Sequence, residues 1–554
     1  MTATTMDTAA GGESRKLTKI VLATGAGAMF EGYDFILFGS LAPLISQHFF
    51  SGINETAAFI FALLTFAAGF AIRPLGAVFF GQLGDRKGRK KAFLITITIM
   101  GLATFGIGLL PTYAGVGILA PILLISLRLM QGLAFGGEYG ASMVYMAEHS
   151  PPHRRGLLTG AIQSTAGFAL FLSFGVIYVT RSIMGEAAFG EWGWRIPFLL
   201  SIILLIISLW IRLTLEESPL FRKMLAEGKE SKRPVREAFS QWRYVKLAIY
   251  ALFGIMAVQG VLFYTAHFYT QFFLTQILKM PGATVTGMMM IITLLSVPLY
   301  LLSAWATDKV GRKPILLIGA IGAAISLFPL FHGLTAAVNP ELAAAQERAP
   351  VVVVADARNC SLQFDPVGEA EFTSSCDIAK SVVTSLGTGY RNQAGEPGAQ
   401  AQVEVGGRVI VSPDGNSLSH EDLRAARAAF RAELQEALSA AGYPETVDLA
   451  TINVPLVGLL VGLLVVFTVM FFAPMAAMAV ELFPTRIRYS AMSLPYHIGS
   501  GWFGGFLPAI AFAMVAARGD IYFGLWYPFT IVVIGILVLA FLLPETRNND
   551  LETM

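Results

Sequence analysis

The stretch Gly81-Gln-Leu-Gly-Asp85-Arg86-Lys-Gly88-Arg89-Lys-Lys91 lies between two long apolar runs. A second version follows much later in the chain, as Ala304-Trp-Ala-Thr-Asp308-Lys-Val-Gly311-Arg312-Lys313. The two copies share the pattern D-[RK]-x-G-R-K, and each joins a pair of segments long enough to cross a bilayer. A loop that is repeated in this way predicts a membrane protein built from two related halves.

Composition supports a membrane protein. The chain has 554 residues, of which 55% are hydrophobic and only 14% charged. This composition excludes an ordinary soluble domain, because long stretches are apolar on every helix face. The net charge of +2 gives no reason to expect a nucleic-acid partner. Residues 1–16 are polar and lack the short apolar core of a cleaved signal peptide.

Twelve runs are long enough to span a bilayer, at roughly 20 residues each. They lie at 17–46, 56–81, 92–111, 115–148, 156–180, 195–214, 244–275, 282–307, 315–336, 451–480, 487–517 and 522–543. Each must be a helix, because lipid offers no hydrogen bonds to an exposed backbone. We therefore expect an all-α membrane protein of twelve helices in two six-helix bundles.

The Lys and Arg residues predict its orientation, because basic loops stay in the cytoplasm. With a cytoplasmic N-terminus, every even-numbered connection is basic and the outer loops hold little basic charge. The predicted parts are a cytoplasmic tail (1–16), an N-terminal bundle (17–214), a basic cytoplasmic linker (215–243), a C-terminal bundle (244–336 and 451–543), an extracytoplasmic insertion (337–450) and a cytoplasmic tail (544–554). The linker is interpreted as a solvated tether, with contact to anionic lipid as the alternative.

The insertion reads as a small folded α+β domain. Pro350 to Val354 predicts a buried strand, and 402–411 predicts a hairpin with Gly406-Gly407 at the turn. Residues 419–441 predict an amphipathic helix, capped by Ser419 and ended by Gly442. The only two cysteines, Cys360 and Cys376, fall inside this domain. On an oxidising outer face we expect them to form a disulfide worth about 3 kcal/mol; two free thiols are the alternative.

Ionisable groups in the middle of a membrane are costly and mark functional sites. Glu31 and Asp34 share one face of the first helix, so their mutual repulsion would raise one pKa toward neutrality, as proton coupling requires. At 1.5 Å per residue, Asp34 lies roughly 22 Å and Arg73 roughly 18 Å from the cytoplasmic ends of their helices. These two could meet near the midplane. A permanent Asp34–Arg73 pair that only fixes helix packing is the alternative.

The fourth predicted helix carries Arg128 and Glu138. The guanidinium of Arg128 could hold a substrate carboxylate, or pair with Glu31 or Asp34 when no substrate is bound. Glu138 is a second candidate for proton transfer. The glycines at 132, 136, 137 and 140 would let neighbouring backbones approach closely. Among the histidines of the second half only His267 is a candidate ligand, and a packing role is the more common one.

The repeated loop suggests a gate. Asp85 lies at the inner end of the second helix, where it could receive the N-terminus of a neighbouring helix, while Gly88 permits a tight turn and Arg89 reaches a carboxylate. Contacts that form in one conformation and break in the other make a gate. The expected gate residues are Gly81, Asp85, Arg86, Gly88, Arg89, Asp308, Gly311 and Arg312. Orientation of the loops alone would be the simpler explanation.

These residues resemble the major facilitator superfamily. Residues 81–91 match its cytoplasmic loop motif, and the second copy departs from it at Ala304. Within the superfamily the chain looks most like the metabolite:proton symporters, a group that includes α-ketoglutarate, citrate, shikimate and proline/betaine permeases. The matching segments are Gly32-Tyr33-Asp34-Phe35, Arg73-Pro-Leu-Gly76, Gln131-Gly132 to Gly140, Trp194 to Phe198, Glu217-Ser-Pro219, Glu481 to Ser490 and Pro544-Glu-Thr546. The resemblance does not cover 337–450.

The resemblance implies alternating access between two bundles. We expect a proton-coupled importer of a small organic acid, multi-pass in the inner membrane, monomeric, with the proton as coupling ion and no other cofactor or metal. Asp34, Glu31 and Glu138 would carry the proton; Arg73, Arg128, Tyr33, Gln131 and His267 would bind substrate or balance charge. Uptake of a zwitterionic osmolyte or a sugar, and a sensor that uses 337–450, are the alternatives. An enzyme is not expected, because the insertion has no metal spacing or nucleophile motif.

Overall fold

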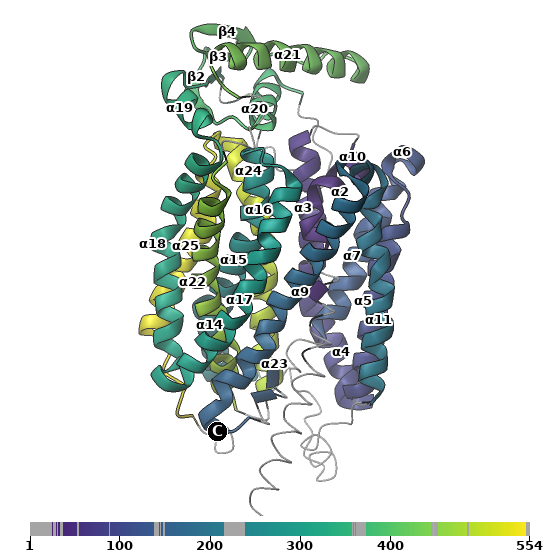
Figure 1. Cartoon of the computed structure of the whole chain (residues 1–554), viewed down its shortest axis with the longest axis vertical. Coiled ribbons are helices and arrows are strands. Elements are labelled where there is room, and N and C mark those ends of the chain that lie inside the picture. The colour runs from purple at the N-terminus through teal and green to yellow at the C-terminus, as the bar shows by residue number, and fades with distance from the viewer. Residues whose placement is uncertain are drawn as a thin grey trace, which may run out of the picture.

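Two helix bundles stand side by side, and a small domain lies at one end of the pair, mainly over one of the bundles (Figure 1). The computed structural model describes residues 25, 29, 32–33, 37–51, 55–87, 89–137, 143–144, 146–147, 150–214, 239–356, 358, 360–361, 373–444, 447, 452–484 and 487–549. The C-terminus lies at the end opposite to the small domain. We call the end that carries the small domain the module end. The opposite end, where a set of buried ion pairs described below joins the bundles, is the network end. The expected fold, an all-α membrane protein with a small α+β insertion, is confirmed.

The first half of the chain forms the N-terminal bundle. Its elements are α2 (Ala42–Phe49), α3 (Glu55–Ala71), α4 (Arg73–Lys87), α5 (Arg89–Leu109), α6 (Tyr113–Val116), α7 (Leu119–Gly136), η1 (Pro152–Arg154), α9 (Arg155–Met184), α10 (Glu186–Ala188), η2 (Phe189–Gly193) and α11 (Arg195–Thr214).

Within the described residues of the whole chain, nine helices are long and apolar enough to cross a membrane, and a bent pair makes a tenth.

The second half forms the C-terminal bundle. Its elements are α14 (Trp242–Ala251), η3 (Leu252–Met256), α15 (Ala257–Tyr264), η4 (Thr265–Tyr269), α16 (Thr270–Phe272), η5 (Phe273–Ile277), α17 (Gly282–Val310), α18 (Arg312–Val338), α22 (Val454–Glu481), α23 (Arg488–Tyr496), η7 (His497–Gly504), α24 (Leu507–Arg518), η8 (Phe523–Leu525) and α25 (Trp526–Phe541). Four of these segments, η3, η4, η5 and η7, are π-helical. Such turns are rare in proteins, and those that occur often lie at functional sites.

The inserted domain, called the module below, comprises residues 340–444. It contains α19 (Pro340–Arg348), β1 (Val352–Ala355), α20 (Ser375–Ser385), β2 (Arg391–Ala394), β3 (Gln402–Val405), β4 (Arg408–Val411) and α21 (His420–Ala440). The sheet has the order β2-β1-β3-β4, and only the β1–β2 pair is parallel. Strand β1, the β3–β4 hairpin, helix α21 and the Cys360–Cys376 disulfide are all confirmed.

Sequence reasoning missed α19, α20 and β2. Helix α20 is rich in Ser, Thr and Val, which have weak helix propensity, so only its burial explains it. Its first turn is secured by Ser374, whose hydroxyl oxygen accepts a hydrogen bond from the Asp377 amide. Strand β2 has four exposed residues and no apolar alternation, so it carries no strand signal.

The two bundles meet along α9 and α17. Glycines on α9 show how close the backbones come, because a Cβ at Gly156 or Gly160 would lie 2.5 or 2.3 Å from an atom of α17. Farther toward the module end, the same distance is 3.2 Å at Gly167 and 3.6 Å at Gly175. The two helices therefore approach most closely at the network end and diverge toward the module end.

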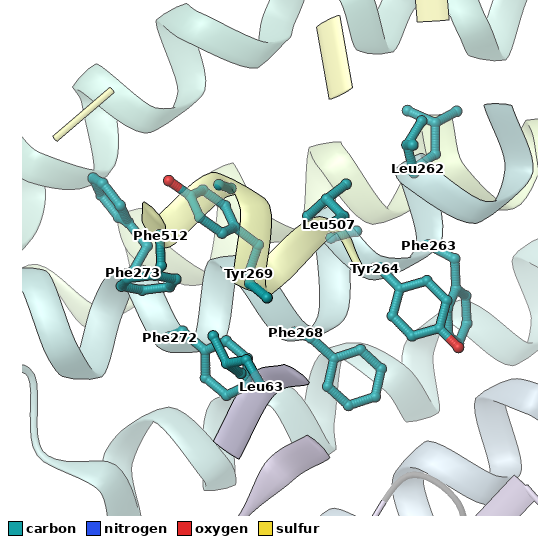
Figure 2. Packing of buried hydrophobic residues seen from close by; sticks show 14 of the residues in the cluster. Leu63, Leu262, Phe263, Tyr264, Phe268, Tyr269, Phe272, Phe273, Leu507 and Phe512 are labelled. Carbon is teal, nitrogen blue, oxygen red and sulfur yellow. The ribbon is translucent and has the colours of Figure 1, made fainter. Parts of the chain in front are cut away.

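Aromatic side chains fill the C-terminal bundle beneath the module. Figure 2 shows Tyr269, Phe272 and Phe273 near Phe512 of α24, with Phe268 on the side of Tyr264. The ring centroids of Tyr269 and Phe512 are 5.5 Å apart, and those of Phe272 and Phe512 are 6.2 Å apart. We call Phe268, Tyr269, Phe272, Phe273 and Phe512 the aromatic layer. Leu63 of α3, from the other bundle, belongs to the same buried cluster.

Candidate functional site

Two arginines of the N-terminal bundle are buried where the bundles meet. Arg73, the first residue of α4, is 2% exposed and lies between the rings of Phe70 and Phe135, 4.0 and 3.9 Å from their centroids. Arg128 of α7 is fully buried and lies 4.4 Å over the ring of Phe38. The two guanidinium groups are close enough to interact electrostatically. Cation–π contacts offset part of the cost of burying these charges.

Gln131 orients Arg128. The Nη1 of Arg128 donates to Oε1 of Gln131 at 2.7 Å, and Nε2 of Gln131 donates to the Thr104 hydroxyl at 2.6 Å. These contacts hold the guanidinium in one position, so the Arg-x-x-Gln spacing has a direct structural reason. The site of Arg128 is thus preorganised by α5 and α7.

Glycines bring α7 close to α3 and to α4, the helix that Arg73 begins. A Cβ at Gly132 would lie 1.8 Å from the carbonyl oxygen of Gly69, and one at Gly136 would lie 2.1 Å from that of Arg73. A Cβ at Gly137 would lie 2.5 Å from the side chain of Phe80. The predicted close approach is confirmed for these three glycines, and Gly140 lies outside the described residues.

The C-terminal bundle contributes Tyr264, Tyr496 and His497 to the same region. Both tyrosines lie near Arg73, and Tyr264 packs edge-on against Phe70 at 5.2 Å. His497 is fully buried in η7, beside Arg73 and the backbone of Gly136. Neither of its ring nitrogens has a hydrogen-bond partner of good geometry among the described residues.

The region therefore combines two arginines from the N-terminal bundle with a histidine from the C-terminal bundle. All three side chains are buried. Sequence reasoning had not selected Tyr264, Tyr496 or His497. Each lies in an apolar run that reads as an ordinary span. The π-helical segment that begins at His497 leaves no readable pattern in the sequence.

Other predicted site residues lie elsewhere or outside the described part. The Tyr33 hydroxyl donates to the Pro197 carbonyl oxygen at 2.9 Å, a contact between helices of the N-terminal bundle. His267 lies 3.0 Å through Nδ1 from the Phe263 carbonyl oxygen of its own helix. Glu31, Asp34 and Glu138, the predicted proton carriers, lie outside the described residues.

The second loop motif is described in full. Asp308, near the end of α17, accepts hydrogen bonds from the amides of Gly156 and Leu157 at 2.9 and 2.8 Å. These amides open α9, in the other bundle, so the carboxylate sits on the positive end of a helix dipole. Gly311 has a φ of +121°, and a Cβ there would lie 2.6 Å from Glu545. Only glycine fits this turn.

Buried ion pairs link the bundles at this end. The Arg312 guanidinium donates to Asp308 at 2.8 Å and to Glu481 at 3.1 Å. Glu481 is fully buried and also receives Arg155, from the N-terminal bundle, at 3.1 Å. The Thr546 hydroxyl donates to the same carboxylate at 2.7 Å. We call Arg155, Asp308, Arg312, Glu481 and Thr546 the ionic network.

The first motif copy is described only in its backbone. Gly81, Asp85 and Arg86 lie on α4 and Arg89 begins α5, while Gly88 and the side-chain positions of the copy lie outside the described part. The expected contact of a motif carboxylate with a helix N-terminus is thus seen at Asp308. For Asp85 it stays a prediction.

Comparison with known families decides the relationship. The pattern of the family described as sugar (and other) transporter matches residues 19–354 and 443–554. The chain belongs to this family. The unmatched stretch, 355–442, falls within the module, so most of the module is an addition to the family pattern. The resemblance to the major facilitator superfamily is confirmed.

Over the stretches that align, several curated relatives are about one-third identical to the chain. The proline/betaine transporter of Escherichia coli (strain K12) is 34% identical over 330 residues, which cover 57% of this chain and 64% of that protein. The shikimate transporter of the same organism is 34% identical over 328 residues, covering 57% and 73%. The inner membrane metabolite transport protein YhjE is 34% identical over 345 residues, covering 61% and 75%.

The fold is similar to that of solved transporters. The major facilitator superfamily proton:xylose symporter XylE, bound to 6-bromo-6-deoxy-D-glucose, superposes with a TM-score of 0.62 over 98% of both chains, at 17% identity. The partially occluded inward-open XylE from E. coli gives a TM-score of 0.58 at 17% identity. At these identities the likeness concerns the fold.

Proposed function

We propose that this protein is a proton-coupled symporter that imports a small carboxylate-bearing metabolite by alternating access. The observation that carries the proposal is the buried pair Arg73 and Arg128 at the meeting of the two bundles. An arginine presents a planar fork of donors that matches a carboxylate, and a dry site strengthens the attraction. Shikimate, proline and betaine, which name the relatives' substrates, all carry a carboxylate.

Binding from both bundles supports alternating access. Arg73 and Arg128 belong to the N-terminal bundle, and Tyr264, Tyr496 and His497 face them from the C-terminal bundle. A substrate held by both sides favours the state in which the bundles close around it. The carboxylates that would carry the proton are Asp34, Glu31 and Glu138, as proposed from the sequence.

The basic loops support the orientation of the protein in the membrane. The network end carries Arg155, Arg312 and Lys313, and the sequence places its other basic segments at the same end. Under the positive-inside rule this is the cytoplasmic face. The module then lies outside the inner membrane, where its disulfide is stable. We propose that both termini are cytoplasmic.

Uptake by proteoliposomes under an imposed pH gradient tests the proposal. Wild-type protein should accumulate a carboxylate, and Arg128→Lys should raise its KM by about tenfold or more, because lysine keeps the charge but loses the fork. Arg195→Lys is the matched control. Arg195 lies over Trp194 and contacts the Leu110 carbonyl, away from the site, so its KM should not change.

The alternatives give different results in the same assay. Accumulation of betaine or proline in preference to acids would identify an osmolyte transporter, which the names of several relatives favour. Accumulation of a sugar alone would contradict the carboxylate assignment. Tight binding of a ligand without any flux would contradict transport and favour a sensor.

A further inference from the structure

Both chain connections of the module lead to the same bundle. It enters from α18 and returns to α22, both in the C-terminal bundle, and the neck is closed by a hydrogen bond from the Asn453 amide to the Ala337 carbonyl at 3.1 Å. Asn339 caps α19 by accepting from the Leu342 amide at 2.9 Å. The helix after the neck therefore starts at a fixed position rather than on a loose linker.

A segment of the module, residues 385–392, crosses the outer loops of the same bundle. We call it the strap. Lys279 donates to the Ser385 carbonyl at 3.1 Å, closing the end of α20. Tyr390 donates through its amide to Gly519 at 2.8 Å and through its hydroxyl to Ala516 at 2.8 Å. Asn392 donates to the Arg518 carbonyl at 2.8 Å. Burial raises the pKa of Tyr390, so its hydroxyl stays a donor.

Helix α20 lies between the module and both bundles. Its residues from Ser375 to Ala379 are all buried, as are Val382 and Val383, so the helix is covered on every face. The sheet and α21 pack on the side of α20 that faces the module, and α24 and α3 contact the side that faces the bundles. Because α3 belongs to the N-terminal bundle, α20 bridges the line along which the bundles must separate at this end.

The disulfide makes this bridge stiff. Cys376 lies in the first turn of α20, and its partner Cys360 follows the end of β1. Asp377 adds a second tie, since it accepts from both the amide and the hydroxyl of Ser361, at 2.9 and 2.6 Å. The helix is therefore held to the sheet at the end where it starts and to the C-terminal bundle through the strap.

We propose that the module is a lid, carried by the C-terminal bundle, which closes the outer entrance by resting α20 on α3. The lid rests on the proposed alternating access, because opening toward the module end separates α3 from α24. Each opening must then break the α20–α3 contact and expose apolar side chains of α20. The module thus stabilises the state that is closed on the outside.

The test uses a reporter cysteine beneath the lid. Leu63→Cys places a thiol on α3, at a position that is fully buried in the closed structure. The two native cysteines are bonded to each other and do not react with maleimide. Loosening the strap with Tyr390→Ala and Asn392→Ala should speed labelling by an impermeant maleimide added on the module side by about fivefold or more. Equal labelling rates would overturn the lid.

Removing the module gives a second, independent measurement of the labelling rate. Because Ala337 and Asn453 are hydrogen-bonded neighbours, residues 339–452 can be replaced by a short Gly-Ser linker without stretching the bundle. The remaining chain has no native cysteine, so Leu63→Cys is its only thiol. Labelling should be at least as fast as in the strap variant, and a rate equal to that of the full chain would again overturn the lid.

Two controls separate the lid from other effects. Arg408→Ala breaks exposed ion pairs with Glu433 and Glu436 on the far side of the module and should leave labelling unchanged. Substrate uptake is measured in the same proteoliposomes. Uptake that continues while labelling stays equal would refute the lid alone, whereas labelling that responds without any uptake would refute the proposed transport.

Discussion

The two ends of the molecule are closed by different physical means. At the network end, buried ion pairs join the bundles, and a motif carboxylate caps a helix of the opposite bundle. At the module end, the links among the described residues are hydrogen bonds, most of which tie the module to the C-terminal bundle, and a covalently braced helix that rests on α3. The glycines of α9 show the same gradient, with near-contact at one end and ordinary spacing at the other.

This difference bears on the proposed alternating access. Buried ion pairs are sensitive to geometry, so they hold the network end in one well-defined arrangement. Their stabilising energy is lost abruptly when that arrangement breaks. The hydrogen bonds and apolar packing at the module end yield more gradually. The module adds contacts at the end where the interface between the bundles diverges. We therefore expect substitutions at the network end to have the larger effects.

The largest effect should come from Glu481→Gln. The substitution leaves Arg155 and Arg312 as buried charges without their shared carboxylate, at a cost of about 3–5 kcal/mol. The thermal midpoint of the purified protein should fall strongly. Glu186→Gln breaks the pair between the exposed Glu186 and the largely buried Arg181 at the module end, and it should cost at most about 1 kcal/mol because Glu186 faces solvent. Similar shifts for both variants would refute the contrast between the ends.

Removing the disulfide should have the next largest effect, and it should be confined to the module. The pair Cys360→Ala and Cys376→Ala restores the entropy of a loop of about 17 residues, which corresponds to about 3 kcal/mol. Limited proteolysis should then cut within the module at lower protease concentrations, while the bundles stay resistant. Cleavage at an unchanged rate would show that packing alone holds α20.

Gly160→Ala compares the two ends along a single helix. Its Cβ would lie 2.3 Å from that of Ala304 on α17, so the bundles must shift apart, at about 1–3 kcal/mol. Gly175→Ala is the matched control, because its Cβ would meet only a methionine sulfur at 3.6 Å. Thermal midpoints measure both. A larger loss for Gly175→Ala would contradict the divergence of α9 and α17.

The smallest effect should come from Tyr390→Phe. It removes one buried hydrogen bond, to the Ala516 carbonyl, and keeps the ring that packs on Gly519. The expected loss is about 1 kcal/mol. Hydrogen exchange of the strap amides should speed up, while exchange in α9 stays the same. Faster exchange at α9 as well would mean that the two ends are not independent.

Within the site, the sequence identified one half of what the structure brings together. Arg73 and Arg128 were found because a charge inside an apolar run is conspicuous. Tyr264, Tyr496 and His497 were missed because aromatic and histidine side chains in such a run are usually packing residues. His267, by contrast, was a candidate and contacts a carbonyl of its own helix. The sequence alone does not show which face of a helix meets the other bundle.

Within the module, local signals separated the correct predictions from the missed elements. The β3–β4 hairpin was predicted because a Gly-Gly pair between two strand-like stretches signals a two-residue turn. In the structure Gly406 and Gly407 have φ values of +56° and +88°, which glycine adopts readily. Helix α21 has a cap at Ser419, where the Asp422 amide donates to the Ser419 hydroxyl oxygen. Helix α20 has low intrinsic propensity and forms because it is covered on every side.

The sequence by itself determined that the chain crosses a membrane many times, that its halves repeat a basic loop motif, and that two cysteines share a separate inserted domain. These features depend on composition, spacing and local backbone preferences, which a linear pattern records. The tertiary structure alone decided that Asp308 caps α9, that Glu481 joins two arginines, and that α20 rests on α3. Each of these contacts joins residues far apart in the chain, and only the packing of helices brings them together.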